Sequence, residues 1–281
     1  MRNHGNRHSE ITPMDPIPTG LSPWGILSRK VEAVLFDIYG TLFISGSGDI
    51  GMAEKNSGNA GRLHQLFQEF SIKEPVETVI KRFFSEIEKA HTNLKSKGID
   101  FPEIRIEEIW KTVLHMDNPK NLMDFSIAYE MCVNPVFPMP NAGNVIDHCR
   151  EKKIVMGIIS NAQFYTTRLF PLFFGAEPSS LGFDPDLMFL SYQLGYAKPS
   201  PYLFQQAVSR LAQKNISPGS VIYIGNDMLN DIYPAHQAGF QTALFAGDKR
   251  SLRLRNEDER CKNLKPDIVI TDLIRLLDHI L

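Results

Sequence analysis

Short apolar runs recur along the chain, and each is long enough for one buried strand. The first spans residues 31–38, is nearly continuous in apolar side chains, and carries Asp37 near its end. Such runs are typical of strands that are buried on both faces of a sheet. Five later runs share this pattern: residues 154–160, 187–191, 221–225, 242–245 and 267–270.

Helical periodicity fills the intervals between the later runs. The predicted helices cover residues 141–151, 162–170, 199–213, 228–238 and 272–280. Strands that alternate with helices along a chain favour parallel pairing, because each helix carries the chain back across one face of the sheet. The pattern therefore predicts an α/β fold with a doubly wound parallel sheet.

The interval from Ile44 to Val136 breaks this alternation, because it contains only helical patterns. These patterns cover residues 61–70, 76–97, 104–116 and 119–132, with prolines at or near three of the starts, where proline is tolerated. We expect an all-helical domain over residues 44–136 and an α/β core over residues 28–43 and 137–281. The helical domain leaves the sheet just after Asp37, so we expect it over the carboxyl ends of the strands, where such sheets bind ligands.

The segments that flank these domains are polar. Residues 1–27 begin without an apolar signal core and contain several prolines, so we expect a disordered or loosely docked arm; docking on the body or on a second subunit is the alternative. Residues 45–49 and 56–61 are rich in Gly, Ser and Asn, which favours hinge loops. A phosphate-binding nest in these loops is a further alternative, although their spacing matches neither familiar phosphate-loop pattern.

Composition narrows the function. The 281 residues are 43% hydrophobic and carry a net charge of −2, so nothing favours nucleic acid or an anionic membrane as a partner. No apolar stretch approaches the roughly 20 residues that cross a bilayer. The 3 cysteines are far apart and form no CxxC pair, which favours free thiols in a reducing compartment. These features predict a cytoplasmic protein.

Four polar segments follow predicted strands, and a parallel sheet would bring them together at one edge. They contain Asp37 and Thr41, Ser160 and Asn161, Lys198, and residues 225–231. A carboxylate such as Asp37 at a strand end can attack an electrophile and form a covalent intermediate. The hydroxyl and amide groups could hold the oxygens of a transferring group, and Lys198 could balance the negative charge. Asp37, Asp227 and Asp231 supply the hard oxygen ligands that suit Mg²⁺.

The order of these segments resembles the haloacid dehalogenase superfamily of phosphatases, dehalogenases and phosphomutases. The likeness covers about residues 31–281 and rests on residues 36–42, 158–161, 195–199 and 224–227, with Asp231 after them. The resemblance implies a Rossmann-like core, an α-helical cap after the first motif, Asp37 as the nucleophile and a magnesium site. Its magnesium ligands would be Asp37, the carbonyl of Tyr39, and Asn226 or Asp227, with Asp231 beside them.

Two departures from the family pattern divide the functional hypotheses. Phosphatases of this family have a second Asp two residues after the nucleophile, where this chain has Tyr39. A tyrosine, with an ordinary pKa near 10, is a poor acid–base catalyst at neutral pH. Tyr39 instead matches the dehalogenase branch, in which a departing halide needs no proton. The pair Asp227 and Asp231 points the other way, since it resembles the magnesium-binding form.

Three hypotheses follow, in order of preference. The first is a Mg²⁺-dependent phosphohydrolase-like enzyme that acts on a small phosphorylated molecule. The second is a metal-independent 2-haloacid dehalogenase. The third is a family member that binds a ligand or a protein partner with little turnover. His64, close to the predicted hinge, could replace the missing acid–base group, although a surface histidine is the simpler interpretation.

Overall fold

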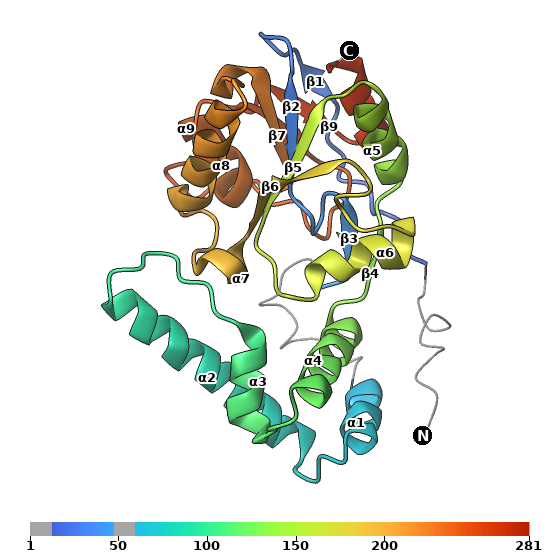
Figure 1. The fold of residues 1–281 in the computed structure, drawn as a ribbon, viewed down its shortest axis with the longest axis vertical. Helices are drawn as coiled ribbons and strands as arrows, with labels where there is room; N and C mark the ends of the chain where they lie inside the picture. The colour runs from blue at the N-terminus through green and yellow to red at the C-terminus, as the bar shows by residue number, and fades with distance from the viewer. Residues whose placement is uncertain (1–12, 48–59, 281) are drawn as a thin grey trace.

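The computed structural model describes residues 13–47 and 60–280, and its centre is a seven-stranded sheet (Figure 1). The described residues do not include residues 1–12 of the arm. They also do not include residues 48–49 and 56–59, which belong to the two segments predicted to be hinge loops or a phosphate-binding nest. The strand order is β1-β9-β8-β7-β2-β5-β6, and every neighbouring pair except β1 with β9 is parallel. The bounds are Trp24–Gly25 (β1), Ala33–Phe36 (β2), Val155–Ser160 (β5), Phe183–Leu190 (β6), Val221–Gly225 (β7), Gln241–Phe245 (β8) and Ile268–Ile270 (β9).

Helices cover both faces of this sheet, which confirms the predicted doubly wound fold. Helix α5 (Ala142–Glu151) and the 3₁₀ segment η7 (Leu273–Asp278) pack on one face, and α8 (Pro201–Gln213) and α9 (Tyr233–Gln237) pack on the other (Figure 1). The central strand β2 sends Val34 and Phe36 into one core and Ala33 and Leu35 into the other. A strand buried on both faces reads as a continuous apolar run, which explains the sequence pattern.

Three predicted helices are shorter or differently wound. The segment predicted at residues 162–170 begins as a turn, followed by the 3₁₀ turn η4 (Thr166–Arg168) and α6 (Leu169–Phe174). The segment at 228–238 starts as a π-turn, η6 (Met228–Ile232), and the C-terminal segment is the 3₁₀ helix η7. Pro234 explains the π-turn, because it has no N–H to donate to the carbonyl four residues earlier.

The interval that was predicted to be purely helical carries a strand at each end. Strand β3 (Phe43–Ser45) pairs antiparallel with β4 (Val136–Pro138), so the prediction of no strand from Ile44 to Val136 is wrong at Ile44, Ser45 and Val136. Strands of three residues are too short to show an alternating pattern. The two strands lie where the chain leaves and re-enters the α/β part of the molecule.

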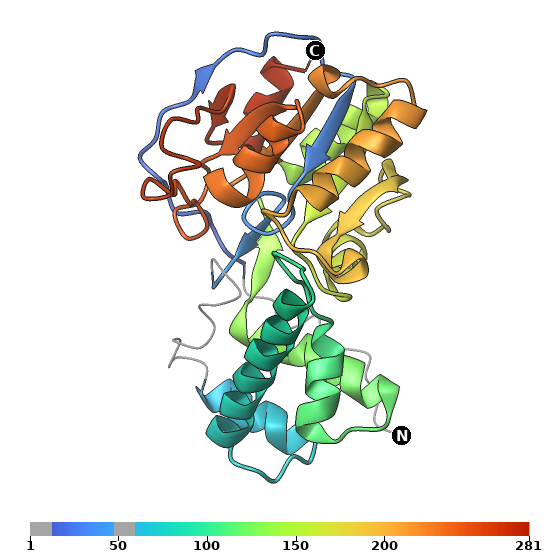
Figure 2. The ribbon, with the colours of Figure 1, turned by 90° about the vertical axis from the view of Figure 1, so that its left-hand side faces the viewer.

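Between these strands lies what we call the helical segment: α1 (Ala60–Glu69), α2 (Val76–Ser96), α3 (Ile106–Leu114) and α4 (Pro119–Val133). It has its own apolar cluster, in which Trp110 stacks on Phe83 with ring centroids 3.9 Å apart. The helical segment stands apart from the sheet at one end of the molecule (Figures 1 and 2). Backbone hydrogen bonds from Ala197 to Phe101 and from Glu103 to Gly195 join it to the loop before Lys198.

The described part of the N-terminal arm lies along the α/β core. Thr19 donates its hydroxyl to the carbonyl of Ala246 over 2.8 Å, and the N–H of Ile17 donates to Asp248. Arg250 donates to the carbonyl of Asp15, and β1 extends the sheet at its edge. These contacts favour the docked alternative for residues 15–25. No helix among residues 13–47 and 60–280 is long and apolar enough to span a membrane.

Candidate active site

Asp37 directly follows β2, at the carboxyl end of the central strand. Its N–H donates to the carbonyl of Ile224 over 2.9 Å, so the pairing with β7 continues through it. The chain then turns sharply at Gly40, whose φ of +82° is costly for any other residue. A Cβ at Gly40 would lie 2.6 Å from the side chain of Ser251. The glycine therefore allows the turn that presents Asp37 at the edge of the sheet.

Lys198 places its ammonium group between two carboxylates. Its Nζ lies 2.7 Å from Oδ1 of Asp37, 2.5 Å from Oδ1 of Asp231 and 3.1 Å from the hydroxyl of Tyr223. The three charged side chains are all buried. Burial alone would lower the pKa of Lys198, but the carboxylates of Asp231 and Asp37 outweigh it and raise the pKa. Lys198 thus stays protonated and holds one oxygen of the candidate nucleophile.

Asp231 anchors Lys198 through a fully occupied carboxylate. Its Oδ1 also accepts from the hydroxyl of Tyr223 over 3.0 Å, and its Oδ2 accepts from the N–H groups of Asn226 and Asp227. Burial, together with the nearby negative charges, raises the pKa of Asp231, and the attraction of Lys198 opposes this shift. The arrangement fixes the position of Lys198 relative to Asp37.

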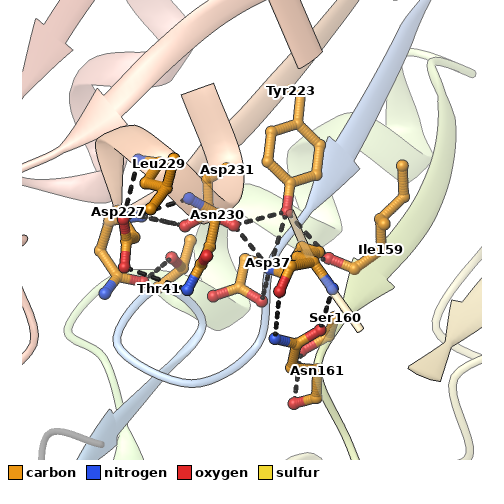
Figure 3. A network of polar contacts seen from close by, with 12 residues as sticks. Asp37, Thr41, Ile159, Ser160, Asn161, Tyr223, Asp227, Leu229, Asn230 and Asp231 are labelled. Carbon is orange, nitrogen blue, oxygen red and sulfur yellow. Dashed lines mark hydrogen bonds and ion pairs between the residues drawn. The ribbon is translucent and has the colours of Figure 1, made fainter. Parts of the chain in front are cut away.

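Asp227 faces the start of the following helix and an arginine. Its Oδ1 accepts from the N–H groups of Leu229 over 2.8 Å and Asn230 over 3.1 Å, as an N-cap does (Figure 3). Its Oδ2 lies 2.5 Å from Nη2 of Arg255. Both oxygens of Asp227 are therefore engaged by other groups.

Asn226 is held by two hydrogen bonds of its amide. Its Oδ1 accepts from the hydroxyl of Thr41 over 3.2 Å, and its Nδ2 donates to the carbonyl of Ser251 over 2.6 Å. No cluster of three or more His, Cys, Asp or Glu side chains suited to a metal ion occurs in the described ranges. Mg²⁺ favours several carboxylate oxygens, and here Lys198 already neutralises Asp37. Contacts with Lys198, Arg255, Thr41 and Ser251 would have to be exchanged before the predicted ligands could hold Mg²⁺, namely Asp37, Tyr39, Asn226, Asp227 and Asp231.

Tyr39 occupies the position of the missing carboxylic acid. Its hydroxyl lies 3.0 Å from Oγ1 of Thr166, with which it forms a hydrogen bond. Burial and then the carboxylate of Glu130 raise the pKa of Tyr39 well above its ordinary value. Tyr39 is thus a neutral phenol at every physiological pH, and it is a weaker acid than an exposed tyrosine.

The remaining predicted residues have structural contacts. Thr41 and Ser160 are fully buried; Ser160 donates its hydroxyl to the carbonyl of Asn161. Asn161 accepts from the N–H of Lys198 over 2.7 Å and donates to its carbonyl over 3.3 Å, so it clamps the backbone that carries the lysine. Of these three residues, only Asn161 lines the cleft at Asp37.

This cleft has a volume of about 100 Å³. Sequence reasoning missed five residues of its wall: Ser45, Asn134, Asn230, Ser251 and Arg253. The backbone of Arg253 bonds to Asn226 and Met228, which brings its side chain to the cleft, and the buried Oγ of Ser251 has no hydrogen-bond partner. Asn230 lay inside a motif, and Ser45 belonged to the segment 45–49 that was considered as a hinge or a phosphate nest. Asn134, Ser251 and Arg253 carried no sequence signal. His64 is exposed on α1, bonds to the carbonyl of Ala60 and does not line the cleft.

Comparison with known proteins identifies the family. A protein-family model described as haloacid dehalogenase-like hydrolase matches residues 31–239. Among solved structures, the 2-haloacid dehalogenase from Pseudomonas syringae pv. Tomato DC3000 is 19% identical, with a TM-score of 0.55 over 88% of this chain and 97% of that one. The L-2-haloacid dehalogenase RSc1362 is 16% identical, with a TM-score of 0.53 over 90% and 99% of the two chains.

A phosphatase is about equally similar. The HAD phosphatase from Thermococcus onnurineus is 18% identical, with a TM-score of 0.53 over 88% of this chain and 97% of that one. At these identities the structures show the shared fold alone. No curated protein matches the sequence. The match of the family model over most of the chain, on a fold that these enzymes share, shows that the chain belongs to the haloacid dehalogenase-like hydrolases.

Proposed function

We propose that this hydrolase forms an ester between Asp37 and its substrate and releases a leaving group that needs no proton. The reaction that the site supports best is the metal-independent displacement of halide from carbon, as in a 2-haloacid. The observation that carries this proposal is Tyr39, a buried neutral phenol whose pKa is raised at the position of the usual acid. An alkoxide is a poor leaving group without a proton, whereas a halide departs as a stable anion.

In the first step, the oxygen of Asp37 that Lys198 leaves available attacks the substrate carbon. A carbon–oxygen bond forms while the carbon–halogen bond breaks, and halide leaves with the bonding electron pair. The ammonium group of Lys198 lies 2.7 Å from the other carboxylate oxygen and holds Asp37 in place for the attack. The charge of Arg253 in the cleft wall would pair with the carboxylate of a 2-haloacid.

In the second step, water attacks the carbonyl carbon of the Asp37 ester. The attack leaves a proton of the water on the tetrahedral intermediate. The bond between the Asp37 carbonyl carbon and the substrate oxygen then breaks. The released alkoxide takes up the proton to give a hydroxy acid, and Asp37 is again a carboxylate.

We further propose that residues 44–136, which contain the helical segment, act as a cap over this cleft. Asn134, directly after α4, lines the cleft, and so does Ser45 at the end of β3. The hydroxyl of Ser45 donates to Oδ1 of Asn134 over 2.8 Å, so both connections to the helical segment meet at the site. Movement of these two strands would open or close access to Asp37.

Hydrolysis of phosphate esters is the second candidate. The observation that favours it is that Asn226 and Asp227 line the same cleft as Asp37. If Asp227 exchanged Arg255 for a cation, a second carboxylate would become available beside the nucleophile.

One assay separates the two candidates. Halide release from 2-chloropropionate and phosphate release from p-nitrophenyl phosphate and acetyl phosphate are measured with Mg²⁺ and with EDTA, using Asp37→Asn as the control. We expect Asp37-dependent halide release that EDTA leaves unchanged. Phosphate release that requires Mg²⁺, without halide release, would reverse the order of the two candidates.

A further inference from the structure

A second cavity lies beside the catalytic cleft, between the helical segment and the turn that follows β5. Its volume is about 110 Å³, of the order of the roughly 150 Å³ cavity that holds benzene in an engineered protein. Most of its wall is apolar and aromatic, from Phe83, Phe84, Ile87, Ile104, Ile106, Trp110, Tyr129, Val133 and Tyr165. Asn134 belongs to the walls of both spaces, so the cavity adjoins the cleft at Asp37.

Two carboxylates, Glu103 and Glu130, interrupt this apolar wall. Glu130 accepts hydrogen bonds from Nδ2 of Asn134 over 3.0 Å and from the hydroxyl of Tyr165. Glu103 accepts from the hydroxyl of Ser191 over 2.6 Å and from other neutral donors. Burial raises the pKa of both carboxyl groups, because neutral donors only partly replace water around a negative charge.

No cation compensates these carboxylates within the described residues. The ion pairs among residues 13–47 and 60–280 include neither Glu103 nor Glu130, and no described Lys or Arg lines the cavity. The described wall has one basic residue, His91, whose pKa is lowered by burial and by Lys95. The cavity therefore combines an apolar body with two carboxyl groups that no described cation pairs.

We propose that this cavity binds an ammonium group carried on a compact hydrocarbon body. An ionised carboxylate away from water is costly unless it is paired, so a cationic ligand would stabilise Glu130. The aromatic walls would add attraction for the cation and would bury the hydrocarbon. A neutral ligand of the same shape gains only the burial of its hydrocarbon.

The position of Asn134 links this site to the chemistry. Its Oδ1 accepts from Ser45, in the wall of the cleft, and its Nδ2 donates to Glu130, in the wall of the cavity. A substrate with its reacting carbon at Asp37 and its ammonium group near Glu130 would pass this amide. This link rests on the proposed function, whereas binding to the cavity does not.

Fluorescence of Trp110 provides the test. The chain has 2 tryptophans, and the other, Trp24, is exposed at the sheet edge, so Trp24→Phe leaves Trp110 as the reporter. The matched probes are benzylammonium and benzyl alcohol, titrated at pH 7.5 with Glu130→Gln and with the control Glu88→Gln, an exposed residue of α2. We expect benzylammonium to bind at least about tenfold more tightly than the alcohol, as one partly desolvated charge interaction would give. Glu130→Gln should abolish this preference, and Glu88→Gln should keep it.

Each outcome supports or overturns the proposal. Equal affinity for the two probes in the parent protein, or no binding of either, overturns it, whatever happens to the folding of Glu130→Gln. A preference that survives both Glu130→Gln and Glu103→Gln also overturns it. Asp37→Asn should bind benzylammonium normally, so selective binding without any Asp37-dependent turnover would support the cavity site and contradict the proposed function.

Discussion

Replacing Lys198 by methionine removes the cation between Asp37 and Asp231 and keeps a side chain of similar length. The exposed fractions of Asp37 and Asp231 are only 5% and 1%, so water cannot take over from the ammonium group. Breaking a buried ion pair by removing one partner typically costs about 3–5 kcal/mol. We expect Lys198→Met to lower the free energy of unfolding by about this amount at pH 8.

The loss of stability in Lys198→Met should depend on pH. Burial already raises the pKa of Asp231 and Lys198 opposes this shift, so without Lys198 the pKa of Asp231 in the folded variant rises further above its unfolded value of about 4. A group with a raised folded pKa contributes stability below the unfolded pKa, and that contribution is lost as pH rises through the folded pKa. Each proton taken up on folding changes the free energy of unfolding by about 1.4 kcal/mol per pH unit. The variant should therefore be closest to wild type in acid.

Urea unfolding at pH 5 and pH 8 measures both effects. The matched control is Lys214→Met, because Lys214 pairs with Asp184 and Asp186 at the surface, and such pairs contribute about 0–1 kcal/mol. If Lys198→Met is no less stable than the control, or if its loss of stability is the same at both pH values, the charges of Asp37, Lys198 and Asp231 do not hold the site together as described.

Three further predictions follow from the same contacts. Tyr39→Phe should keep kcat for halide release within about threefold and lose about 1 kcal/mol of stability with its hydrogen bond to Thr166; a hundredfold loss of kcat would make Tyr39 a proton donor. Arg255→Met should release Asp227 and create Mg²⁺ binding detectable by calorimetry that wild type lacks or shows more weakly; unchanged binding would mean that Arg255 does not block this carboxylate. Gly40→Ala should cost roughly 1–3 kcal/mol from its left-handed backbone alone, and the close approach to Ser251 should abolish turnover; wild-type thermal stability and kcat would contradict the role of the turn.

The part of the fold that the sequence predicts is the part with strong periodicity. Continuous apolar runs mark strands buried on both faces, and the alternation with helices predicts their parallel order. The hydrophobic pattern does not predict strands β3 and β4, because three residues are too few to show a period. The loss of a regular helix at residues 228–238 depends on one proline and one cap, which a hydrophobic pattern does not register.

The sequence likewise predicts one part of the candidate site and misses another. The sequence predicts that Asp37, Lys198 and Asp231 meet at one edge, because all three follow parallel strands. Whether Asp227 faces a metal or caps a helix cannot be read from spacing, since an Asp before a helix serves equally in both roles. Its partner Arg255 lies 28 positions along the chain, in a segment without a motif. Ser251 and Arg253 lie in the same segment, which explains why sequence reasoning missed them.

The most direct test of the central claim is to find where the oxygen of water enters during one turnover. Excess enzyme is mixed with 2-chloropropionate in heavy-oxygen water, and mass spectrometry then compares the peptide that contains Asp37 with the lactate released. If Asp37 forms the ester and water attacks its carbonyl carbon, the label enters the Asp37 carboxylate and the first lactate is unlabelled. Labelled lactate with an unlabelled Asp37 peptide would show direct attack by water on the substrate and would contradict the account.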